Sequence, residues 1–448
     1  MTPRPAWPED ALLGLHSRFP DRYPVLLESV GGEPALGRYD VLMALPGERL
    51  VRLPDGRLEG PVDGQSRFLD ALDAWWRRES ASTGDTVPFA GGWFVYAGYE
   101  LAAEVEPTVA LPRASLPAAV AWRMHGAVVR DRETGHVSFH ASGAGAAALE
   151  AAAAADCASA VAGVQVPVDP LIVGAIEEEP PSRFTDGVRQ VLEAIARGDV
   201  YQANLSRGWR ARLAPGASAT DLYRRLRSAN PAPFAGIAAL PGCTLLSSSP
   251  ERLIRVRAGE VGTRPIAGTR PRGDSARDDE ALKRDLVLNE KERAEHVMLV
   301  DLERNDLGRI CRGGTVEVDE FMTVETYATV HHIVSNVRGQ LRDGVTPGQA
   351  IAAVFPGGTI TGCPKVRCMQ LLAELEGGPR DAYTGSMGYL GLDGSLDMNI
   401  LIRTLTVEDG VVSFRTGAGI VADSRPEAEL AETRAKARGL LRALGVAA

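Results

Sequence analysis

The chain has 448 residues, of which 45% are hydrophobic, enough for one large domain or two smaller ones. Its formal net charge of −9 argues against a nucleic-acid-binding surface, which would be basic. No apolar run approaches the roughly 20 residues that span a membrane, and the first residues do not resemble a signal peptide. The five cysteines match no zinc or redox spacing, so we expect reduced, mostly buried thiols and a cytoplasmic location.

The first part of the chain, residues 12–165, is predicted to alternate strands with turns. It includes one helix near residues 68–77 and ends in an alanine-rich stretch, which predicts a further helix because Ala is the best helix former. The prolines and acidic residues of 166–184 then indicate a linker. We therefore expect residues 12–165 to form an N-terminal region separated from the rest of the chain.

From residue 185 the pattern changes to longer elements. The periodicity predicts helices, one of them a charged helix over about 275–300, and strands, among which 200–213 is the longest. Long strands with helices collected between them, and no repeat of fixed period, favour an α+β fold over a repeated βαβ unit. Residues 183–440 are predicted to form a second domain.

Near the C-terminus, an alternating run at 411–416 predicts a strand that ends in Gly417, Ala418 and Gly419. These small residues would form a turn that lets a ligand approach the backbone closely. The segment also fits the GxGxxA dinucleotide fingerprint, but the glycines do not open a helix and no βαβ unit surrounds them. The glycines therefore indicate a small anionic ligand rather than a dinucleotide.

A helix is predicted to come next, because Ser424 and Glu427 have the spacing of a capping box. On it Glu429 and Glu432 lie three residues apart, with Lys436 one turn further along the same face. Carboxylates at helical spacing are most often a solvated face, so this pair alone does not define a site.

A second carboxylate pair, Glu292 and Glu295, lies on one face of the charged helix. Two helices that each offer such a pair could clamp Mg²⁺, which prefers oxygen ligands. The alternative is two unrelated solvated faces, and spacing alone favours this alternative.

Several segments together resemble the chorismate-utilising enzymes, the component I subunits of anthranilate synthase and aminodeoxychorismate synthase. The resemblance is dense over 183–440 and loose in the N-terminal region. It implies the superfamily's sandwich of two β layers with outer helices, and chorismate as substrate. The segments are GDVYQANLSR (198–207), SSSPERL (247–253), TRPIAGTRPRG (263–273), AEHVMLVDLERNDLGRI (294–310), FPGGTITGCPKVR (355–367), AYTGSMGYL (382–390), MNILIRTL (398–405) and GAGIVADS (417–424).

The resemblance also implies roles for single residues. Glu295 and Glu432 match Mg²⁺ ligands, with Glu292 and Glu429 beside them acting through water. Glu251 matches the general acid that protonates the leaving 4-hydroxyl, which requires a carboxyl kept protonated by burial.

His332 matches a histidine implicated in proton handling, whereas its neighbour His331 does not; the alternative for a lone histidine is a packed core residue. The remaining matches would bind substrate, and arginine suits a carboxylate because its planar fork bonds it at two points. These residues are Arg403 and Tyr383 for the enolpyruvyl carboxylate, with Gly268, Thr269, Thr359, Gly417, Ala418, Gly419 and Lys436 completing the shell. Within the 301–310 segment we interpret Arg304, Asn305 and Asp306 as a structural turn and cap.

Gln202 and Ala267 bear on which member of the family this is. Relatives that add water to chorismate carry a lysine base where Gln202 stands, and glutamine has no basic form. An ammonia-using enzyme is therefore expected. One type of aminodeoxychorismate synthase carries a nucleophilic lysine where Ala267 stands, and alanine cannot form that covalent adduct. This departure resembles anthranilate synthase.

Other segments resemble the aminodeoxychorismate form: NPAPF (230–234), FPGGTITGCPK (355–365) and SLDMNILIRTL (395–405). Our hypothesis is aminodeoxychorismate synthase component I. The alternatives are anthranilate synthase component I and a non-catalytic, tryptophan-binding regulatory subunit. Because the chain carries no glutaminase nucleophile motif, ammonia would come from a separate glutamine amidotransferase subunit.

A tryptophan pocket is also implied, because residues 26–29 resemble the tryptophan-binding segment of both subgroups. The alternative is an ordinary buried strand crossing. The predicted pocket residues are Ser29, Arg38, Tyr39, Pro233, Phe234 and Ala235.

Overall fold

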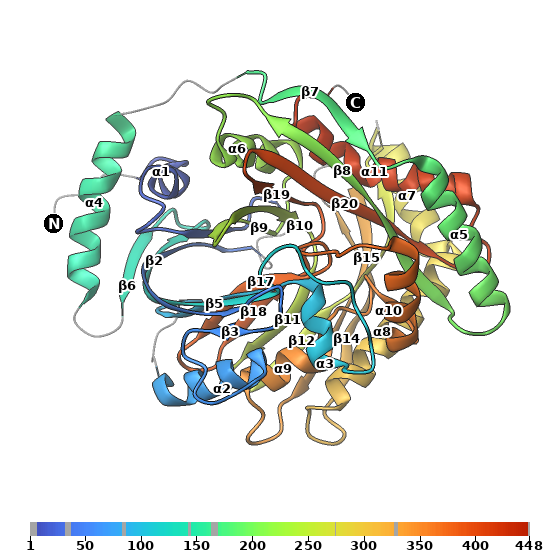
Figure 1. Cartoon of the computed structure of the whole chain (residues 1–448), viewed down its shortest axis with the longest axis horizontal. Helices are drawn as coiled ribbons and strands as arrows, with labels where there is room; N and C mark the ends of the chain where they lie inside the picture. The colour runs from blue at the N-terminus through green and yellow to red at the C-terminus, as the bar shows by residue number, and fades with distance from the viewer. Residues whose placement is uncertain are drawn as a thin grey trace.

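The computed structural model describes residues 7–31, 37–82, 87–141, 145–162, 169–273, 275–326 and 330–446. It is an α+β fold in which long antiparallel strands occupy the centre and most helices lie outside them (Figure 1), which confirms the class expected from sequence. The helices are α1 (Ala11–Arg18), α2 (Phe68–Glu79), α3 (Ala102–Val105), α4 (Ala146–Ala162), α5 (Pro181–Ala196), α6 (Ala219–Ala229), α7 (Ala276–Leu288), α8 (Glu290–Gly308), α9 (Pro347–Val354), α10 (Lys365–Glu376) and α11 (Pro426–Ala443), with a 3-10 turn at Tyr99–Leu101.

The strands pair in one continuous antiparallel series. From one end its order is β7, β8, β20, β19, β10, β9, β1, β2, β5, β4, β17, β18, β11, β12 and β15, with β13 and β14 also beside β15. Figure 1 shows the series folding over, with β8 and β20 above and β5 and β18 below. The bounds are β1 (Val25–Glu28), β2 (Tyr39–Arg52), β3 (Leu58–Glu59), β4 (Gly92–Ala97), β5 (Ala119–Asp131), β6 (Val137–Ala141), β7 (Ile172–Glu178), β8 (Gln202–Leu213), β9 (Phe234–Leu240), β10 (Cys243–Ser249), β11 (Arg252–Arg257), β12 (Glu260–Arg264), β13 (Ile266–Pro271), β14 (Glu317–Thr326), β15 (Val330–Gln340), β16 (Gly362–Cys363), β17 (Ser386–Gly391), β18 (Leu396–Asn399), β19 (Thr404–Glu408) and β20 (Val411–Ile420).

The two regions predicted from sequence share this sheet. Strand β1 pairs with β9, and β4 pairs with β17, so hydrogen bonds join 12–165 to 183–440 at two places. The boundaries themselves stay a prediction.

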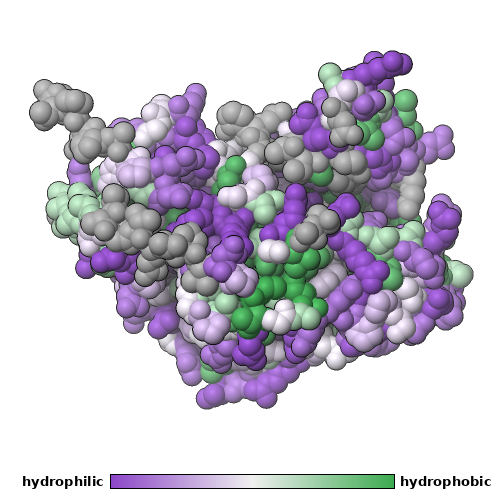
Figure 2. Space-filling view, turned by 90° about the horizontal axis from the view of Figure 1, so that it is seen from above, coloured by the Kyte–Doolittle hydropathy of each residue, from purple (hydrophilic) through white to green (hydrophobic). Residues whose placement is uncertain are grey.

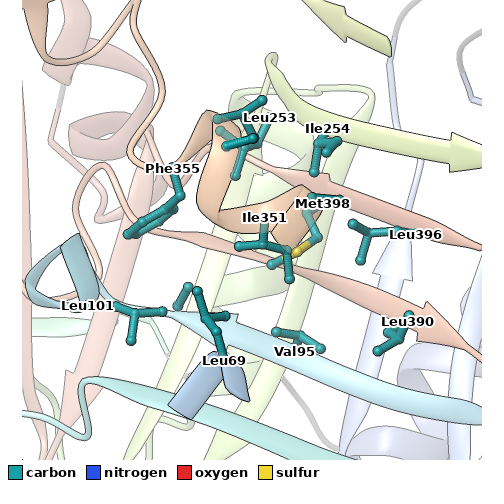
Figure 3. Packing of buried hydrophobic residues seen from close by; sticks show 14 of the residues in the cluster. Leu69, Val95, Leu101, Leu253, Ile254, Ile351, Phe355, Leu390, Leu396 and Met398 are labelled. Atoms are coloured by element: carbon teal, nitrogen blue, oxygen red, sulfur yellow. The ribbon is translucent and has the colours of Figure 1, made fainter. Parts of the chain in front are cut away.

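One hydrophobic core lies beneath the segment that comes after α9. Figure 3 shows Ile351 and Phe355 packed among side chains of the sheet, including Leu253 and Met398. All four are buried, and withdrawing each from water contributes roughly 1.5–3 kcal/mol. The core therefore fixes the start of the 355–362 segment, which carries a predicted site residue.

Helix α9 is also anchored by polar contacts. Thr346 and Gln349 form a capping box at its start. Asp73, on α2, accepts hydrogen bonds from the Thr346 hydroxyl and from the Gly348 backbone N–H, the latter at 2.7 Å. Since Asp73 is buried, these bonds replace the water that its carboxylate has lost.

The surface is mostly hydrophilic on the face shown in Figure 2, with one apolar patch below its centre. No helix in the described ranges combines the length and the apolar character that crossing a membrane requires. The five cysteines are free, and Cys243, Cys311 and Cys368 are buried, as expected.

The charged helix expected over 275–300 is two helices, α7 and α8, divided at Asn289. The Asn289 side chain caps α8 by accepting a hydrogen bond from the Glu292 backbone N–H at 3.0 Å. The expected turn and cap at Arg304, Asn305 and Asp306 is also wrong, because α8 continues to Gly308.

The linker expected over 166–184 is wrong where it is described. Residues 172–178 form β7, which pairs with β8, and α5 begins at Pro181. Ile172 and Ile176 pack against the core that includes Trp209 of β8. The sequence did not predict this strand, because acidic residues and prolines dominate the segment and few of its side chains pack against the core.

The glycine turn near the C-terminus is likewise wrong. Gly417, Ala418 and Gly419 lie within β20 and pair with residues 204–206 of β8. Long-range pairing with β8 has overridden the local preference of glycine for a turn.

Ser424 does not cap the last helix. Its hydroxyl accepts a hydrogen bond from the Val421 backbone N–H at 3.1 Å, whereas Arg425 holds the N-cap position of α11 without a side-chain cap bond. The helix itself is where it was expected, so its carboxylates keep their spacing.

Candidate active site

Glu251 lies in the connection between β10 and β11, and its side chain is almost fully buried. Thr359 donates a hydrogen bond to Glu251 Oε1 at 2.7 Å. Burial raises the pKa of Glu251 to about 7, although the Thr359 bond and the positive charges of Arg403 and Lys436 oppose the rise. The carboxyl can therefore hold a proton near neutral pH, as a general acid must.

His332 lies on β15 and is buried. Its Nδ1 is 3.2 Å from the carbonyl oxygen of Gly268. A carbonyl only accepts, so Nδ1 carries the proton and Nε2 is the basic nitrogen of the ring. Burial, helped by the charge of Arg403, lowers the pKa of His332 to about 3, so its imidazole is neutral.

His331, the next residue towards the N-terminus, has a different environment. Its Nε2 lies 2.8 Å from Asp279 of α7, and its Nδ1 lies 3.0 Å from the Thr326 hydroxyl. Successive residues of a strand face opposite sides, so only one histidine of the pair can reach the site. The two histidines therefore have different hydrogen-bond partners, and the role of His332 stays a prediction.

Gly268 occupies a position that only glycine fits. Its φ is +67°, and a Cβ there would lie 2.8 Å from Leu286 and 2.9 Å from Glu292 Oε2. Glycine thus lets the carboxylate of α8 lie directly against the strand whose carbonyl holds His332. Thr269 is the next residue on β13, opposite His332 in the register, and its side chain is outside the described part.

Gly417 and Gly419 give β20 a backbone face without side chains. A Cβ on Gly417 would lie 2.6 Å from the Tyr383 hydroxyl, and one on Gly419 would lie 2.4 Å from Gln202 Nε2. The side chains of Tyr383 and Gln202 therefore occupy the space beside the backbone of Gly417 and Gly419, respectively. The buried Ala418 between them packs into the core below.

The Tyr383 ring packs against a buried ion pair. Arg380 and Glu376 lie 2.7 Å apart, and the Arg380 guanidinium lies 5.5 Å from the centre of the Tyr383 ring. Asn204 Nδ2 lies 3.5 Å from the Tyr383 hydroxyl. Asn204, Glu376 and Arg380 were not predicted from the sequence, although Asn204 lies within the 198–207 motif, because their contacts with Tyr383 and with one another form only when β8 and α10 pack together.

Arg403 lies between β18 and β19 with φ at +52°, a backbone conformation rare for a residue with a side chain. Such strain persists only where surrounding structure enforces it, and it is concentrated at functional sites. Its carbonyl accepts the Ser248 N–H at 3.2 Å, which ties Arg403 to the strand that leads to Glu251.

Lys436 and Glu432 lie one turn apart on α11 with 2.8 Å between their charged atoms. Lys436 Nζ also donates to the carbonyl oxygen of Gly417 at 3.1 Å. The charge of Lys436 acts on both Glu251 and His332, so α11 contributes to the same site as β15. Glu429, on the same helix, is buried.

The four predicted metal ligands come from two helices, α8 and α11. Carboxylate oxygens suit Mg²⁺, so the donor chemistry fits. Across the described ranges, however, no three His, Cys, Asp or Glu side chains lie close enough together to hold a metal ion. Glu292 forms an ion pair with Arg270 at 3.1 Å, and Glu432 forms one with Lys436. One carboxylate on each of the two helices is therefore already neutralised by a cationic side chain.

A cavity of about 880 Å³ lies apart from these residues, between the start of β9 and strands β2 and β17. The Ser29 hydroxyl donates to the Pro233 carbonyl at 2.8 Å across it. All six residues predicted for a tryptophan pocket line this one cavity: Ser29, Arg38, Tyr39, Pro233, Phe234 and Ala235.

Comparison with known proteins is consistent with this geometry. The family described as chorismate binding enzyme matches residues 52–442. The chain belongs to this family. It is a chorismate-utilising enzyme of the anthranilate synthase and aminodeoxychorismate synthase type.

Relatives of both kinds share the chain's sequence. An "Anthranilate synthase component I-like protein" of Synechocystis is 41% identical over 360 residues, which is 80% of this chain and 73% of that protein. "Anthranilate synthase component 1 3" of Haloarcula marismortui is 39% identical over 438 residues, 93% of this chain and 85% of that protein. "Aminodeoxychorismate synthase component 1" of Bacillus subtilis is 48% identical over 261 residues, 58% of this chain and 55% of that protein.

The fold is also that of a solved relative. The crystal structure of anthranilate synthase component I from Streptococcus pneumoniae aligns with a TM-score of 0.78 at 30% identity. The alignment covers 90% of this chain and 92% of that one. The two-layered arrangement of this chorismate-binding family member therefore matches an experimental structure over most of its length.

Glu251→Gln should change how stability depends on pH. Burial raises the pKa of Glu251 from 4.5 to about 7, so the folded chain keeps a proton that the unfolded chain releases. This stabilisation is complete below about pH 4.5 and is lost as the pH rises through 7. Glutamine cannot ionise. The free energy of unfolding of the variant should therefore rise relative to that of the wild type by roughly 1.4 kcal/mol for each pH unit between pH 4.5 and about 7.

Urea denaturation at pH 5 and pH 8 measures this difference. Glu374→Gln, on the exposed face of α10, is the control and should differ from wild type equally at both pH values. A Glu251→Gln difference that is the same at pH 5 and pH 8 would show that Glu251 does not titrate in this range.

Proposed function

We propose that the chain is the component I subunit of an aminodeoxychorismate synthase, which aminates chorismate with ammonia to 4-amino-4-deoxychorismate on the route to 4-aminobenzoate and folate. The observation that carries this choice is the form of the segments that build the site. Residues 355–365 place Thr359 beside Glu251, and residues 395–405 place Arg403; both have the aminodeoxychorismate form. The match to the Bacillus subtilis protein of that name supports it.

The residues of the site can supply the parts of this reaction. The protonated Glu251 donates its proton to the 4-hydroxyl of chorismate as the C4–O bond breaks, and the hydroxyl leaves as water. The nitrogen of ammonia forms the new bond at C4 and loses a proton to water. The low pKa of His332 keeps its Nε2 unprotonated, so the ring can accept a hydrogen bond but does not hold that proton. Arg403 and Tyr383 hold the enolpyruvyl carboxylate, and Lys436 with the bare backbone of Gly417 completes the substrate shell.

Gln202 and Ala267 support ammonia as the nucleophile and a route without an enzyme adduct. The Gln202 side chain is buried against Gly419 and has no basic form with which to activate water. Ala267 is a buried residue of β13 beside Gly268, where a methyl group cannot attack the ring.

Anthranilate synthase component I is the second candidate, in which nitrogen enters at C2 and pyruvate is eliminated. Ala267 favours it, and so do the names of the Synechocystis and Haloarcula relatives. Both candidates use the same acid, Glu251, and the same carboxylate-binding groups, so the product decides between them.

We also propose a glutamine amidotransferase as partner, which would supply ammonia, since relatives of this chain are named as component 1 of an enzyme. The five free thiols support a cytoplasmic setting.

Magnesium is proposed to bind between α8 and α11, held by Glu295 and Glu432, with Glu292 and Glu429 beside it. When bound, the ion would supply positive charge at the ring carboxylate of chorismate. The ion pairs of Glu292 with Arg270 and of Glu432 with Lys436 would then open in favour of the ion.

The 880 Å³ cavity is proposed to bind tryptophan. Its lining offers aromatic rings, the Ser29 hydroxyl and the guanidinium groups of Arg38 and Arg252, which suit an indole and a carboxylate.

Incubation with chorismate, Mg²⁺ and ammonium, with and without an aminodeoxychorismate lyase, tests the reaction. We expect 4-aminobenzoate only when the lyase is present, because the product keeps its enolpyruvyl group. Anthranilate formed without lyase would show the second candidate, and no turnover of chorismate would favour a non-catalytic, tryptophan-binding subunit. Replacing ammonium by glutamine should stop the reaction until an amidotransferase subunit is added.

Glu432→Ala should weaken metal binding by about 10- to 100-fold or more and reduce Mg²⁺-dependent turnover accordingly. Mn²⁺ used as a probe in electron paramagnetic resonance reports binding without turnover. Glu427→Ala, exposed on the same helix, is the matched control and should bind as the wild type does. An unchanged Mn²⁺ affinity in Glu432→Ala would exclude this residue as a ligand.

Tryptophan should bind in calorimetry at one site per chain, and Ser29→Ala should weaken it by roughly tenfold, as expected for a lost hydrogen bond near the cavity wall. Ser80→Ala, on an exposed residue after α2, should bind normally. The absence of heat with the wild type at millimolar tryptophan would contradict the pocket.

A further inference from the structure

The guanidinium of Arg380 is buried, and each of its five N–H groups donates a hydrogen bond. Two of them bind the carboxylate of Glu376, at 2.8 and 2.7 Å. The others reach the carbonyl oxygens of Asn204 at 2.7 Å and Ile360 at 3.4 Å, and the hydroxyl of Thr384 at 3.2 Å. One side chain thus joins β8, the 355–362 segment, α10 and the turn that carries Tyr383.

The same guanidinium lies over two tyrosine rings. Its central carbon is 4.7 Å from the centre of the Tyr99 ring and 5.5 Å from the centre of the Tyr383 ring. A guanidinium can do this because it is planar: its face stacks on a ring while its edge donates hydrogen bonds. A lysine ammonium has neither the flat face nor five donors.

The turn that carries Tyr383 has a strained backbone. Asp381 has φ at +49° and Thr384 has φ at +62°, a region that residues with a side chain rarely adopt. Such conformations persist only where the surrounding structure enforces them. Here the Thr384 hydroxyl accepts from Arg380, and the Glu100 carboxylate accepts the backbone N–H groups of Arg380 at 2.7 Å and Asp381 at 3.1 Å. Arg380 and Glu100 therefore fix the turn from its two sides.

The phenol of Tyr383 leads from this turn to the backbone of β20. A Cβ on Gly417 would lie 2.6 Å from the Tyr383 hydroxyl, so the hydroxyl lies directly against that strand. The Asn204 side chain is 3.5 Å from the same hydroxyl and donates to the Ile360 carbonyl at 3.0 Å. Arg380 binds the backbone carbonyls of both Asn204 and Ile360, so it fixes the neighbours of the hydroxyl as well as the ring.

The alternative is that Arg380 and Glu376 are an ordinary ion pair of the core. The cost of removing two charges from water can exceed their attraction, so a buried pair is by itself weak evidence for stability. Glu376 also accepts hydrogen bonds from the backbone N–H and the hydroxyl of Ser206, both at 2.8 Å. The pair therefore binds β8 at Ser206 and at Asn204, which fixes the turn relative to that strand. Two apolar side chains could not do this.

We propose that Arg380 is a positioning residue that holds the Tyr383 hydroxyl against the backbone of Gly417, in place before a substrate carboxylate arrives. The inference rests on the carboxylate-binding role proposed for Tyr383, and it assigns Arg380 no contact with substrate. A group that is already ordered loses less conformational entropy when a ligand binds. The effect of Arg380 should therefore fall on the affinity for chorismate more than on the rate at saturation.

Arg380→Lys tests this, because it keeps a positive charge beside Glu376 and removes the planar fork. Calorimetry with chorismate and Mg²⁺, without ammonia, should show a dissociation constant raised by about tenfold, the loss expected for one hydrogen bond to a charged group. In turnover with ammonium, KM should rise similarly, while kcat for chorismate consumption should fall by less than about twofold. Arg57→Lys, in an exposed ion pair with Asp55, is the matched control and should bind as the wild type does.

A double-mutant cycle with Tyr383→Phe separates positioning from general loss of structure. Tyr383→Phe removes only the hydroxyl and should itself weaken chorismate binding by about tenfold. Adding Arg380→Lys to Tyr383→Phe should weaken binding by less than a further twofold or so, because the group that Arg380 positions is already gone. A purely structural role would weaken binding equally in both backgrounds.

Tyr99 offers variants that leave the ion pair intact, which decide the question if Arg380→Lys does not fold. Among the described residues the Tyr99 hydroxyl has no hydrogen-bond partner. Tyr99→Phe keeps the ring and should bind chorismate as the wild type does. Tyr99→Leu removes the ring that stacks on Arg380 and should weaken binding about threefold, again only when the Tyr383 hydroxyl is present.

Fluorine NMR of the protein without substrate reports the position of the ring directly. With Tyr383 replaced by 3-fluorotyrosine, the wild-type background should give one narrow resonance, which Arg380→Lys should shift and broaden because the ring loses its stacking partner. An unchanged resonance would overturn the inference, and so would an equal loss of affinity in the two backgrounds of the cycle. Normal chorismate binding by Tyr383→Phe would reject it together with the role of Tyr383. Formation of anthranilate would reject only the proposed function, since no binding measurement depends on the product.

Discussion

The withdrawal of the Glu251 carboxyl from water is the constraint on which the proposed chemistry depends. A carboxyl in water is ionised at neutral pH and cannot protonate a leaving hydroxyl. Here the fold closes around Glu251 from the β10–β11 connection, from the segment after α9 and from the connection that carries Arg403. The hydrophobic core under Ile351 and Phe355 holds this arrangement, so packing is a condition of the acidity.

The site is assembled from elements far apart in the chain. Strand β15 provides His332, β20 provides a backbone face, and α11 provides Lys436, which binds that face through the carbonyl of Gly417. Glycine matters at Gly268 and Gly417 because side chains of other elements occupy the space that a Cβ would need. Because these two glycines have no side chain, neighbouring side chains can occupy that space in the site.

The candidate tryptophan cavity and the active site share one strand pair. Phe234, which lines the cavity, is opposite Ser249 in the register of β9 and β10, and Ser249 Oγ accepts the backbone N–H of Glu251 at 3.2 Å. The cavity and the candidate active site are therefore connected through the paired strands β9 and β10. The N-terminal region adds β1 to the other edge of β9.

The sequence by itself determined the fold class, the spacing of the carboxylates on α8 and α11, and the family to which the chain belongs, because these depend on local periodicity and on motifs that are contiguous in the chain. It did not determine that Gly417 continues a strand, that α8 extends through Asp306, or that residues 172–178 form β7. In each case a partner distant in sequence decides: β8 pairs with both strands, and Lys365 binds Asp306. Local residue order thus specified the chemical groups, and tertiary packing decided their acidity and their neighbours.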